Sequence, residues 1–294
     1  MKTSLAPGFH VAAGRPVDSA AYDQSTGQWS RLFVPSVLDA AGVDQGWRVL
    51  DVSTGTGEAA LAISPVIGAS GLLVGADIAP AMLESARTRL HQAAFLPVAA
   101  DVQALPFADG SFDAVICQLG LQFFPNPGLG LIELRRVLRD GGRIAICVAS
   151  TPDQVPLWGI LAEVLGRLLP EQLHVVQLSF SLADKARLEQ LFAASGFDGV
   201  RVERQQREGV LASFDEYWKS LAAGQGSIAQ VCLMLPETKR NEVREEVSAR
   251  LAHFQSNEGL RMRFEMLIGS GRRVNASATA EMRLDLPIGV PNKM

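Results

Sequence analysis

The sequence VLDVSTGTGEAA, at residues 49–60, decides the fold. It begins with a β-branched and apolar run, continues through the small residues of a turn, and ends in Ala-rich, helix-forming sequence. This order predicts a strand, a tight loop and a helix, and in an open α/β sheet such a loop lies where ligands bind. Gly55 and Gly57 permit close backbone approaches that a Cβ would block, and Asp51 adds a carboxylate beside the loop. The stretch therefore predicts a site for a nucleoside cofactor.

The same alternation of strand and helix continues on both sides of this stretch. Patterns of apolar residues predict strands at residues 48–52, 72–76, 96–100, 112–117 and 143–148, with helices between them. Repeated units of this length indicate a doubly wound, Rossmann-like parallel sheet. Two further strands are predicted at residues 200–204 and 260–268, and the alternation of the last one favours an antiparallel strand. The expected fold is thus α/β, with a sheet of seven strands and a helical cap.

Changes in the pattern along the chain predict its organisation. Residues 47–150 form the expected cofactor-binding α/β core, and residues 1–46 are an N-terminal helical cap or lead-in. Residues 151–274 complete the core with the last two strands and carry inserted helical cap segments, and residues 275–294 are a polar tail.

Composition excludes several classes of function. A net charge of −4 and a pI near 5.7 argue against a nucleic-acid partner, which requires a basic face. The three cysteines are widely spaced, so nothing in the sequence builds a metal site, and Cys117 and Cys147 are expected to be buried thiols. No uncharged apolar run reaches the ~18 residues of a membrane helix, and the N-terminus lacks the apolar core of a signal peptide. A cytoplasmic protein without stable membrane insertion is expected.

Two cofactors compete for the glycine-rich loop. Residues 55–60 match the dinucleotide pattern G-x-G-x-x-A, and Asp77 follows about 20 residues on, which alone would suggest an NAD-dependent dehydrogenase. However, the carboxylate of Asp51 would repel a pyrophosphate and attract a cationic cofactor with an amino group. Asp101 supplies another acidic strand end. Acidic residues at three strand ends favour a ligand rich in hydroxyl and amino groups that lacks phosphate.

At this point the sequence resembles a known family. Residues 49–60, 75–83, 100–107 and 111–146, with Tyr22-Asp23 and residues 27–30, are similar to class I S-adenosylmethionine-dependent methyltransferases of the ubiquinone/menaquinone-biosynthesis type. These stretches span about residues 20–150 and are specific in combination. The resemblance implies S-adenosylmethionine as the cofactor and methyl transfer to a small molecule as the activity.

The resemblance also implies a role for individual residues. The backbone of residues 53–57, which includes Ser53, Thr54, Gly55 and Gly57, would pass beside the methionine part of the cofactor, and Asp51 would hold the loop or the amino group. Asp77 would bind both ribose hydroxyls. The remaining expected contacts are Ile78 and Met82 on an adenine face, Asp101 and the Val102 N–H at the adenine edge, Gln118 near the methionine end, and Tyr22 closing over it.

Each of these assignments has a structural alternative. Asp77 and Asp101 could simply cap a helix or a turn, Met82 could be ordinary core, and Gln118 could serve a loop. Ser53 departs from the family, which usually has glycine at this position. Its Cβ stands where the cofactor would approach closely, so we expect either a shifted loop or a lower affinity.

The sequence says less about the acceptor. Methyl transfer from a sulfonium is an in-line displacement that depends mainly on proximity and orientation, and a general base helps only where the acceptor must lose a proton. His174 is the candidate base, with a solvated or packed cap histidine as the more frequent alternative, and Tyr22 and Tyr217 are further candidates. The cap is rich in aromatic residues, which favours a mostly apolar small-molecule acceptor: Phe123, Phe124, Trp158, Phe180, Phe214 and Trp218.

Two other functions stay open from the sequence. One is a protein of the same fold that binds the cofactor but catalyses a non-methylating reaction such as a cyclisation, because fold does not fix function. The other, less favoured, is the NAD-dependent dehydrogenase. A homodimer is compatible with the sequence but not indicated by any particular stretch.

Overall fold

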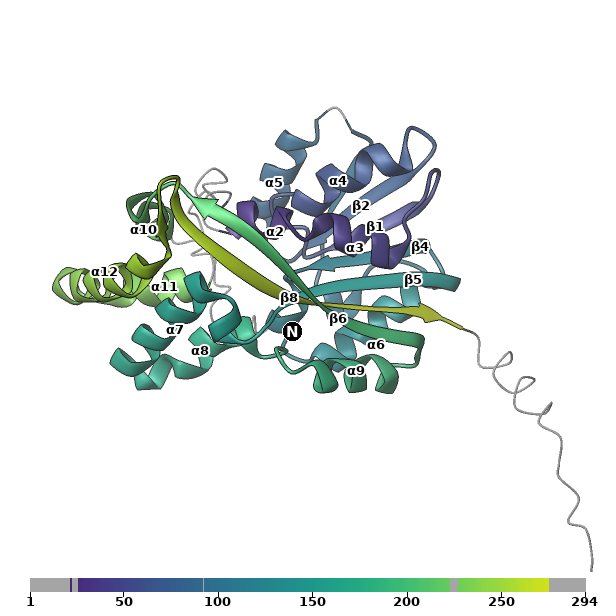
Figure 1. The fold of residues 1–294 in the computed structure, drawn as a ribbon. Helices are drawn as coiled ribbons and strands as arrows, with labels where there is room; N and C mark the ends of the chain where they lie inside the picture. Colours follow the sequence, from purple (N-terminus) through teal and green to yellow (C-terminus); the bar gives the residue numbers. More distant parts are fainter. Residues whose placement is uncertain (1–21, 23–25, 92, 223–226, 275–294) are drawn as a thin grey trace, which may run out of the picture.

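One mixed sheet organises the molecule (Figure 1). The computed structural model describes residue 22 and residues 26–91, 93–222 and 227–274. Along the sheet the strands follow the order β3-β2-β1-β4-β5-β8-β6, and the short β7 pairs with β8. Their bounds are β1 Arg48–Val52, β2 Leu72–Asp77, β3 Phe95–Ala99, β4 Phe112–Gln118, β5 Leu138–Ala149, β6 Phe197–Leu211, β7 Gln255–Ser256 and β8 Gly259–Arg273.

Strands β1 to β5 are parallel, and β8 is antiparallel to both β5 and β6. The predicted fold class and the antiparallel last strand are therefore confirmed. In the ladder, Asp51 pairs with Gly75 and Asp77 pairs with Ala99, so the carboxyl ends of β1, β2 and β3 meet at one edge of the sheet. This register places the predicted acidic strand ends along the same edge.

Helices cover both faces of the sheet (Figure 1). On one side lie α3 (Val34–Ala41), α4 (Glu58–Ile67) and α5 (Pro80–Arg89), and on the other lie α6 (Pro127–Val137) and α9 (Lys185–Ala194). Alternate residues of each central strand therefore enter two different cores. In β5, for example, Ala145 and Cys147 belong to the first core, and Ile144 and Ile146 belong to the second. A strand buried on both faces explains its nearly continuous apolar sequence.

Strands β6 and β8 are far longer than their sequence predicts, and they carry the chain from the sheet to the helical cap (Figure 1). The pattern predicts β6 at residues 200–204, whereas the strand runs over Phe197–Leu211. Its second half is polar, but each residue from Arg201 to Leu211 has a partner in β8. Backbone pairing with β8 therefore decides this part of the strand, because side-chain pattern is only one of the factors that stabilise a strand.

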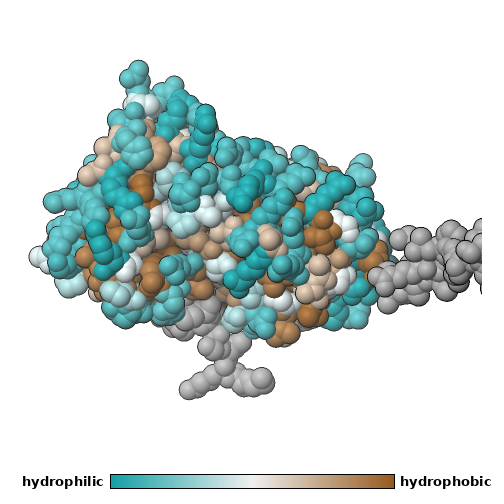
Figure 2. All heavy atoms as spheres, turned by 60° about the horizontal axis from the view of Figure 1, so that its bottom comes forward, coloured by the Kyte–Doolittle hydropathy of each residue, from teal (hydrophilic) through white to brown (hydrophobic). Residues whose placement is uncertain are grey.

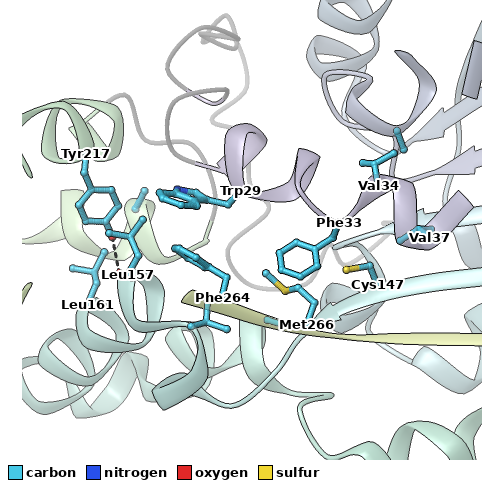
Figure 3. Close-up of a cluster of buried hydrophobic side chains, with 14 of the residues drawn as sticks. Trp29, Phe33, Val34, Val37, Cys147, Leu157, Leu161, Tyr217, Phe264 and Met266 are labelled. Atoms are coloured by element: carbon cyan, nitrogen blue, oxygen red, sulfur yellow. Dashed lines mark hydrogen bonds between the residues drawn. The ribbon is translucent and has the colours of Figure 1, made fainter. Parts of the chain in front are cut away.

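The helical cap lies at the far end of these two strands and shares one core with them. It contains α7 (Pro156–Leu168), α8 (Leu173–Gln177), α10 (Phe214–Ala222), α11 (Ser227–Met234) and α12 (Glu237–Leu251). Between cap and strands, Trp29 stacks on Phe264 with ring centroids 4.1 Å apart (Figure 3). Trp29 comes from the short N-terminal helix α2 (Gln28–Arg31), so the N-terminal lead-in is part of this core.

Local signals account for several helix ends. Ser213 caps the start of α10, with the Glu216 N–H donating to Ser213 Oγ at 3.2 Å. Asp184 caps α9 by accepting from the Ala186 N–H at 2.8 Å. After α9, Gly196 adopts the left-handed conformation, with φ of +81°, that ends many helices.

The face that carries α6 and α9 is mostly hydrophilic, with hydrophobic side chains in separate patches (Figure 2). Leu129 and Ile132 of α6 are each 52% exposed. Within the described ranges of the chain, no helix combines the length and the apolar character that crossing a membrane requires.

Candidate functional site

A pocket lies at the carboxyl end of β1, directly over the glycine-rich loop. Ten residues line it: Tyr22, Ser30, Asp51, Ser53, Thr54, Gly55, Thr56, Glu58, Ala59 and Gln118. The structure thus brings together, from three parts of the chain, the predicted residues Tyr22, Asp51, Ser53, Thr54, Gly55 and Gln118. Thr56 falls within the predicted backbone of residues 53–57, and the sequence reasoning missed Ser30, Glu58 and Ala59.

Two turns with a non-glycine residue in the left-handed region lie against each other, and one of them, at Ser53, lines the pocket. Ser53, after β1, has φ of +55°, and Leu119, after β4, has φ of +56°, a region that costs an L-residue about 1–2 kcal/mol. The turns touch, since a Cβ added to Gly120 would lie 2.5 Å from Ser53 Cβ. Gly120 therefore provides the space that Ser53 occupies. Non-glycine residues in the left-handed region are typical of functional sites, where surrounding structure maintains the strain.

Asp51 is a buried carboxylate with an unsatisfied oxygen. Its side chain is 1% exposed, and Oδ2 accepts a hydrogen bond from Thr54 Oγ1 at 2.6 Å. Oδ1 has no hydrogen-bond partner among the described residues. Burial, opposed by the hydrogen bond from the Thr54 hydroxyl and assisted by the nearby charge of Asp77, raises the pKa of Asp51 to about 7. A buried polar group of this kind requires an explanation, and a ligand in the pocket provides one.

Asp77 holds the glycine-rich loop against β2. One of its oxygens accepts from the Gly55 N–H at 2.9 Å, and the other accepts from the Ala79 N–H at 2.9 Å. Burial raises the pKa of Asp77, and the amides of Ala79 and Gly55 oppose this. Asp77 does not line the pocket, but its hydrogen bond from the Gly55 N–H holds a residue that does. Each carboxylate oxygen can accept more than one hydrogen bond, so the two amides leave capacity for ligand hydroxyls.

Gly55 leaves open space between the loop and Tyr22. Its φ is +54°, and a Cβ added there would meet nothing closer than the Ser53 carbonyl and the Tyr22 hydroxyl, both at 3.9 Å. A side chain at this position would fill the gap. The Tyr22 hydroxyl therefore lies near the loop, and its closing over the cofactor stays a prediction.

Gln118 connects the end of β4 to the N-terminal lead-in. Its Nε2 donates to the Ser30 carbonyl at 3.1 Å, and its Oε1 is buried without a hydrogen-bond partner in the described part of the chain. The side chain is 9% exposed. Gln118 thus holds the N-terminal lead-in through Nε2, while Oε1 remains available to accept a hydrogen bond.

The other predicted cofactor residues lie outside the pocket lining, at or near the same edge of the sheet. Gly57 precedes α4 with φ of +88°, and a Cβ there would lie 2.8 Å from Leu90, so it allows α4 and α5 to approach. Ile78 is 37% exposed beside Asp77, whereas Met82 and Val102 are buried. Asp101 caps the short helix at Val102–Ala104 by accepting from the Gln103 N–H at 2.9 Å.

His174, the candidate base, is exposed on α8 and is not among the described residues that line the pocket. This position matches the alternative interpretation, a solvated histidine of the cap. Tyr217 is buried in the cap core, where its hydroxyl donates to the Leu157 carbonyl at 3.0 Å (Figure 3). Burial raises the pKa of Tyr217 well above its usual range.

The cap aromatics do not form one surface. Trp158, Phe180, Phe214 and Trp218 are half-buried against the core that contains Trp29, whereas Phe124 packs against the core on the other face of the sheet. Phe214 and Trp218 stack with their ring centroids 5.9 Å apart. Four of the six predicted residues thus share one side of the protein.

The charges of the pocket distinguish between the two cofactors. Its described lining contains two carboxylates, Asp51 and Glu58, and neither lysine nor arginine. Glu58 is paired with Arg31 and Arg89, whereas Asp51 has no cationic partner in the lining. A dinucleotide pyrophosphate would therefore face the Asp51 carboxylate without a lining cation. A cofactor with a sulfonium and an ammonium group fits the unpartnered oxygen of Asp51, because an opposite charge stabilises an ionised carboxylate.

Comparison with known proteins identifies the family. The sequence pattern of the ubiE/COQ5 methyltransferase family matches residues 24–217. The chain belongs to this family. As a family member it is a methyltransferase that uses S-adenosylmethionine and acts on a small molecule.

Two relatives show the extent of this similarity. The chain is 32% identical over 186 residues to the ubiquinone/menaquinone biosynthesis C-methyltransferase UbiE of Serratia proteamaculans, covering 58% of this chain and 74% of the relative. It is 38% identical over 145 residues to the demethylmenaquinone methyltransferase of Renibacterium salmoninarum, covering 49% of this chain and 57% of that protein. Among these and similar curated relatives, the matched region covers between 53% and 77% of the relative's own length.

Solved structures support the fold of this ubiE/COQ5 family member. A methyltransferase of Bacillus halodurans superposes with a TM-score of 0.56 at 20% identity, over 82% of this chain and 99% of that one. The Haemonchus contortus phosphoethanolamine N-methyltransferase 2, solved with S-adenosyl-L-methionine, gives 0.56 at 18% identity, over 87% of this chain and 56% of that one. At these identities the likeness concerns the fold alone.

Proposed function

We propose that the chain transfers the methyl group of S-adenosylmethionine to a mostly apolar small-molecule acceptor by in-line displacement. The observation that carries the proposal is the carboxylate of Asp51: the residue lines a pocket over a glycine-rich loop, and its Oδ1 is buried without a hydrogen-bond partner among the described residues. When bound, the cofactor would supply an activated methyl group. The chain's own residues then have to bind it, orient it and exclude water.

The proposed cofactor contacts follow the edge of the sheet. Asp51 would accept a hydrogen bond from the α-ammonium group, and the backbone from Ser53 to Gly57 would face the methionine part. Gln118 would contribute its spare Oε1 at the methionine end, while Tyr22 would cover it. Beyond the pocket we propose that Asp77 takes the ribose hydroxyls, with Ile78 and Met82 on an adenine face and Asp101 and Val102 at its edge.

The acceptor would enter from the side of the cap, where four of the predicted aromatic residues are half-buried. Aromatic side chains of this kind favour an apolar ring or chain. The relatives are named for ubiquinone, menaquinone and demethylmenaquinone chemistry. We therefore place reduced demethylmenaquinone analogues first among the acceptors to test.

The test is methyl transfer with labelled cofactor. The protein is incubated with methyl-labelled S-adenosylmethionine and, in separate reactions, reduced demethylmenaquinone analogues, simple phenols, polar metabolites and cell extract, followed by mass analysis. We expect the label in an apolar product. Reaction of a polar metabolite while every apolar compound fails would refute the apolar acceptor, and cofactor binding without any labelled product would favour a non-methylating reaction.

A cytoplasmic location and a homodimer are proposals of lower rank, which come from the sequence. Cell fractionation tests the first, and light scattering of the purified protein tests the second.

A further inference from the structure

Glu58 is the first residue of α4 and one of the pocket residues that the sequence reasoning missed. Its carboxylate is buried, with the residue 7% exposed, and it is paired with two arginines from two different elements. Glu58 Oε2 lies 2.9 Å from Arg31 Nε, and Glu58 Oε1 lies 2.6 Å from Arg89 Nη2. One carboxylate therefore links α4 to both α2 and α5.

The Arg89 side of this arrangement reaches the glycine-rich loop. Arg89 Nη1 donates to the Thr56 carbonyl at 2.9 Å and contacts Thr56 Oγ1 at 3.1 Å. Thr56 lines the pocket and is itself 1% exposed. The Arg89 guanidinium thus binds Glu58 through Nη2 and Thr56 through Nη1, which restrains the turn between Gly55 and Gly57.

The Arg31 side reaches the N-terminal wall of the pocket. Arg31 is the last residue of α2, and the neighbouring Ser30 lines the pocket. The Ser30 carbonyl accepts from Gln118, so α2 is attached to β4 on one side and to α4 on the other. A helix of four residues is too short to hold its own position in water, so these attachments and the burial of Trp29 must place it.

A simpler interpretation is that Glu58 only complements the helix dipole, which favours acidic residues in the first turn. That effect requires proximity to the N-terminus but no particular partner. It does not explain why the carboxylate is buried and shared between two guanidinium groups of other elements. Burial of a charge is costly unless it is paired and hydrogen-bonded, and here both pairings lead to the pocket walls.

We propose that Glu58 is a positioning residue for cofactor binding: its carboxylate holds the α2 wall through Arg31 and the Thr56 turn through Arg89. The proposal rests on the cofactor site argued under Proposed function. It predicts that Glu58 affects the affinity for the cofactor rather than the rate of the transfer step.

The test compares Glu58→Gln with the wild-type protein, using S-adenosylhomocysteine for binding by calorimetry and S-adenosylmethionine for kinetics. We expect the Kd for S-adenosylhomocysteine and the KM for S-adenosylmethionine to rise about tenfold, a usual size for coupling between sites, with kcat at saturating cofactor unchanged. Arg31→Met, at a more exposed position, should raise the Kd by roughly threefold, and adding it to Glu58→Gln should cause no further rise.

The control is Glu163→Gln, which makes the same chemical change in a more exposed ion pair of the cap, between Glu163 of α7 and Arg250 of α12, 2.6 Å apart. It should leave the Kd unchanged. A Glu58→Gln variant that melts earlier but binds normally, or one that loses kcat alone, would show that Glu58 is merely structural and overturn the proposal. If Glu58→Gln does not fold, an unchanged Kd in Arg31→Met overturns it. Failure of the wild-type protein to bind would overturn the cofactor site as well.

Discussion

Replacement of Asp51 by asparagine should make the empty protein more stable while it weakens cofactor binding. Burial raises the pKa of Asp51 from 3.8 to about 7, so above neutral pH the folded protein contains an ionised carboxylate that is worse solvated than in the unfolded chain. A difference of about 3 pKa units corresponds to about 4 kcal/mol of lost stability at high pH. The new amide nitrogen would lack a partner and cost about 2 kcal/mol, so we expect a net gain of about 2 kcal/mol at about pH 8.

The pH dependence gives this prediction its sign. Because the folded state binds the Asp51 proton more tightly than the unfolded state, this group lowers the stability of the wild-type protein as the pH rises from about 4 to about 7, and its effect is constant above that range. Asparagine does not titrate. The advantage of Asp51→Asn should therefore be close to zero at about pH 5 and grow by about 2–3 kcal/mol towards pH 8.

The assay is urea unfolding of both proteins at a series of pH values, repeated with S-adenosylhomocysteine. Asp39→Asn, on the exposed surface of α3, is the control for the same chemical change at a solvated position. For Asp51→Asn we also expect a Kd that is about tenfold to a hundredfold higher, because a hydrogen bond between charged groups is lost. A stability difference that does not vary with pH, or unchanged binding, would refute the reasoning.

Three further substitutions test the turns and the cap. Ser53→Gly should stabilise the fold by about 0.5–1 kcal/mol in thermal unfolding, because glycine adopts φ of +55° without strain. It should also lower the Kd for S-adenosylmethionine. Unchanged or weaker binding would contradict the role given to the Ser53 Cβ. Gly120→Ala should destabilise by about 1–3 kcal/mol and weaken binding, since its Cβ would lie 2.5 Å from Ser53 Cβ, and the double variant with Ser53→Gly should recover part of the loss. Tyr217→Phe should cost about 1 kcal/mol in urea unfolding by leaving the Leu157 carbonyl unsatisfied, with kcat unchanged; a large fall in kcat would instead give Tyr217 a part in the reaction.

Local pattern predicted the core of the fold and, among the residues that line the pocket, Asp51 and Gly55. Asp51 and Asp77 lie at the ends of strands whose limits are recognisable from the turns and helices that follow them. Because the strands are parallel, these ends lie at one edge of the sheet. Tyr22 and Gln118 could be added because the sequence resembles a family. The sequence does not show that both oxygens of Asp77 accept backbone amides, and the contact of Asp77 with a ligand stays a prediction.

Glu58 shows what the sequence could not provide. Its partners lie 27 residues before it and 31 residues after it, so no local spacing relates them. The position of Glu58 at the start of an Ala-rich helix could have indicated a role at the pocket. However, the helix dipole already explains an acidic residue at such a position. The second half of β6 is a similar case, because its polar sequence becomes a strand only through backbone pairing with β8.

The sequence by itself determined which segments are strands and helices in the core. Burial of particular faces requires apolar residues at regular spacings, and these spacings can be recognised within each segment. It also determined that the ligand edge of the sheet is acidic. The tertiary structure alone decided how far β6 and β8 extend, which carboxylates are already satisfied, and which arginines hold the pocket walls. These properties depend on contacts between residues distant in the chain, where burial and pairing set the energy of each charge and each backbone hydrogen bond.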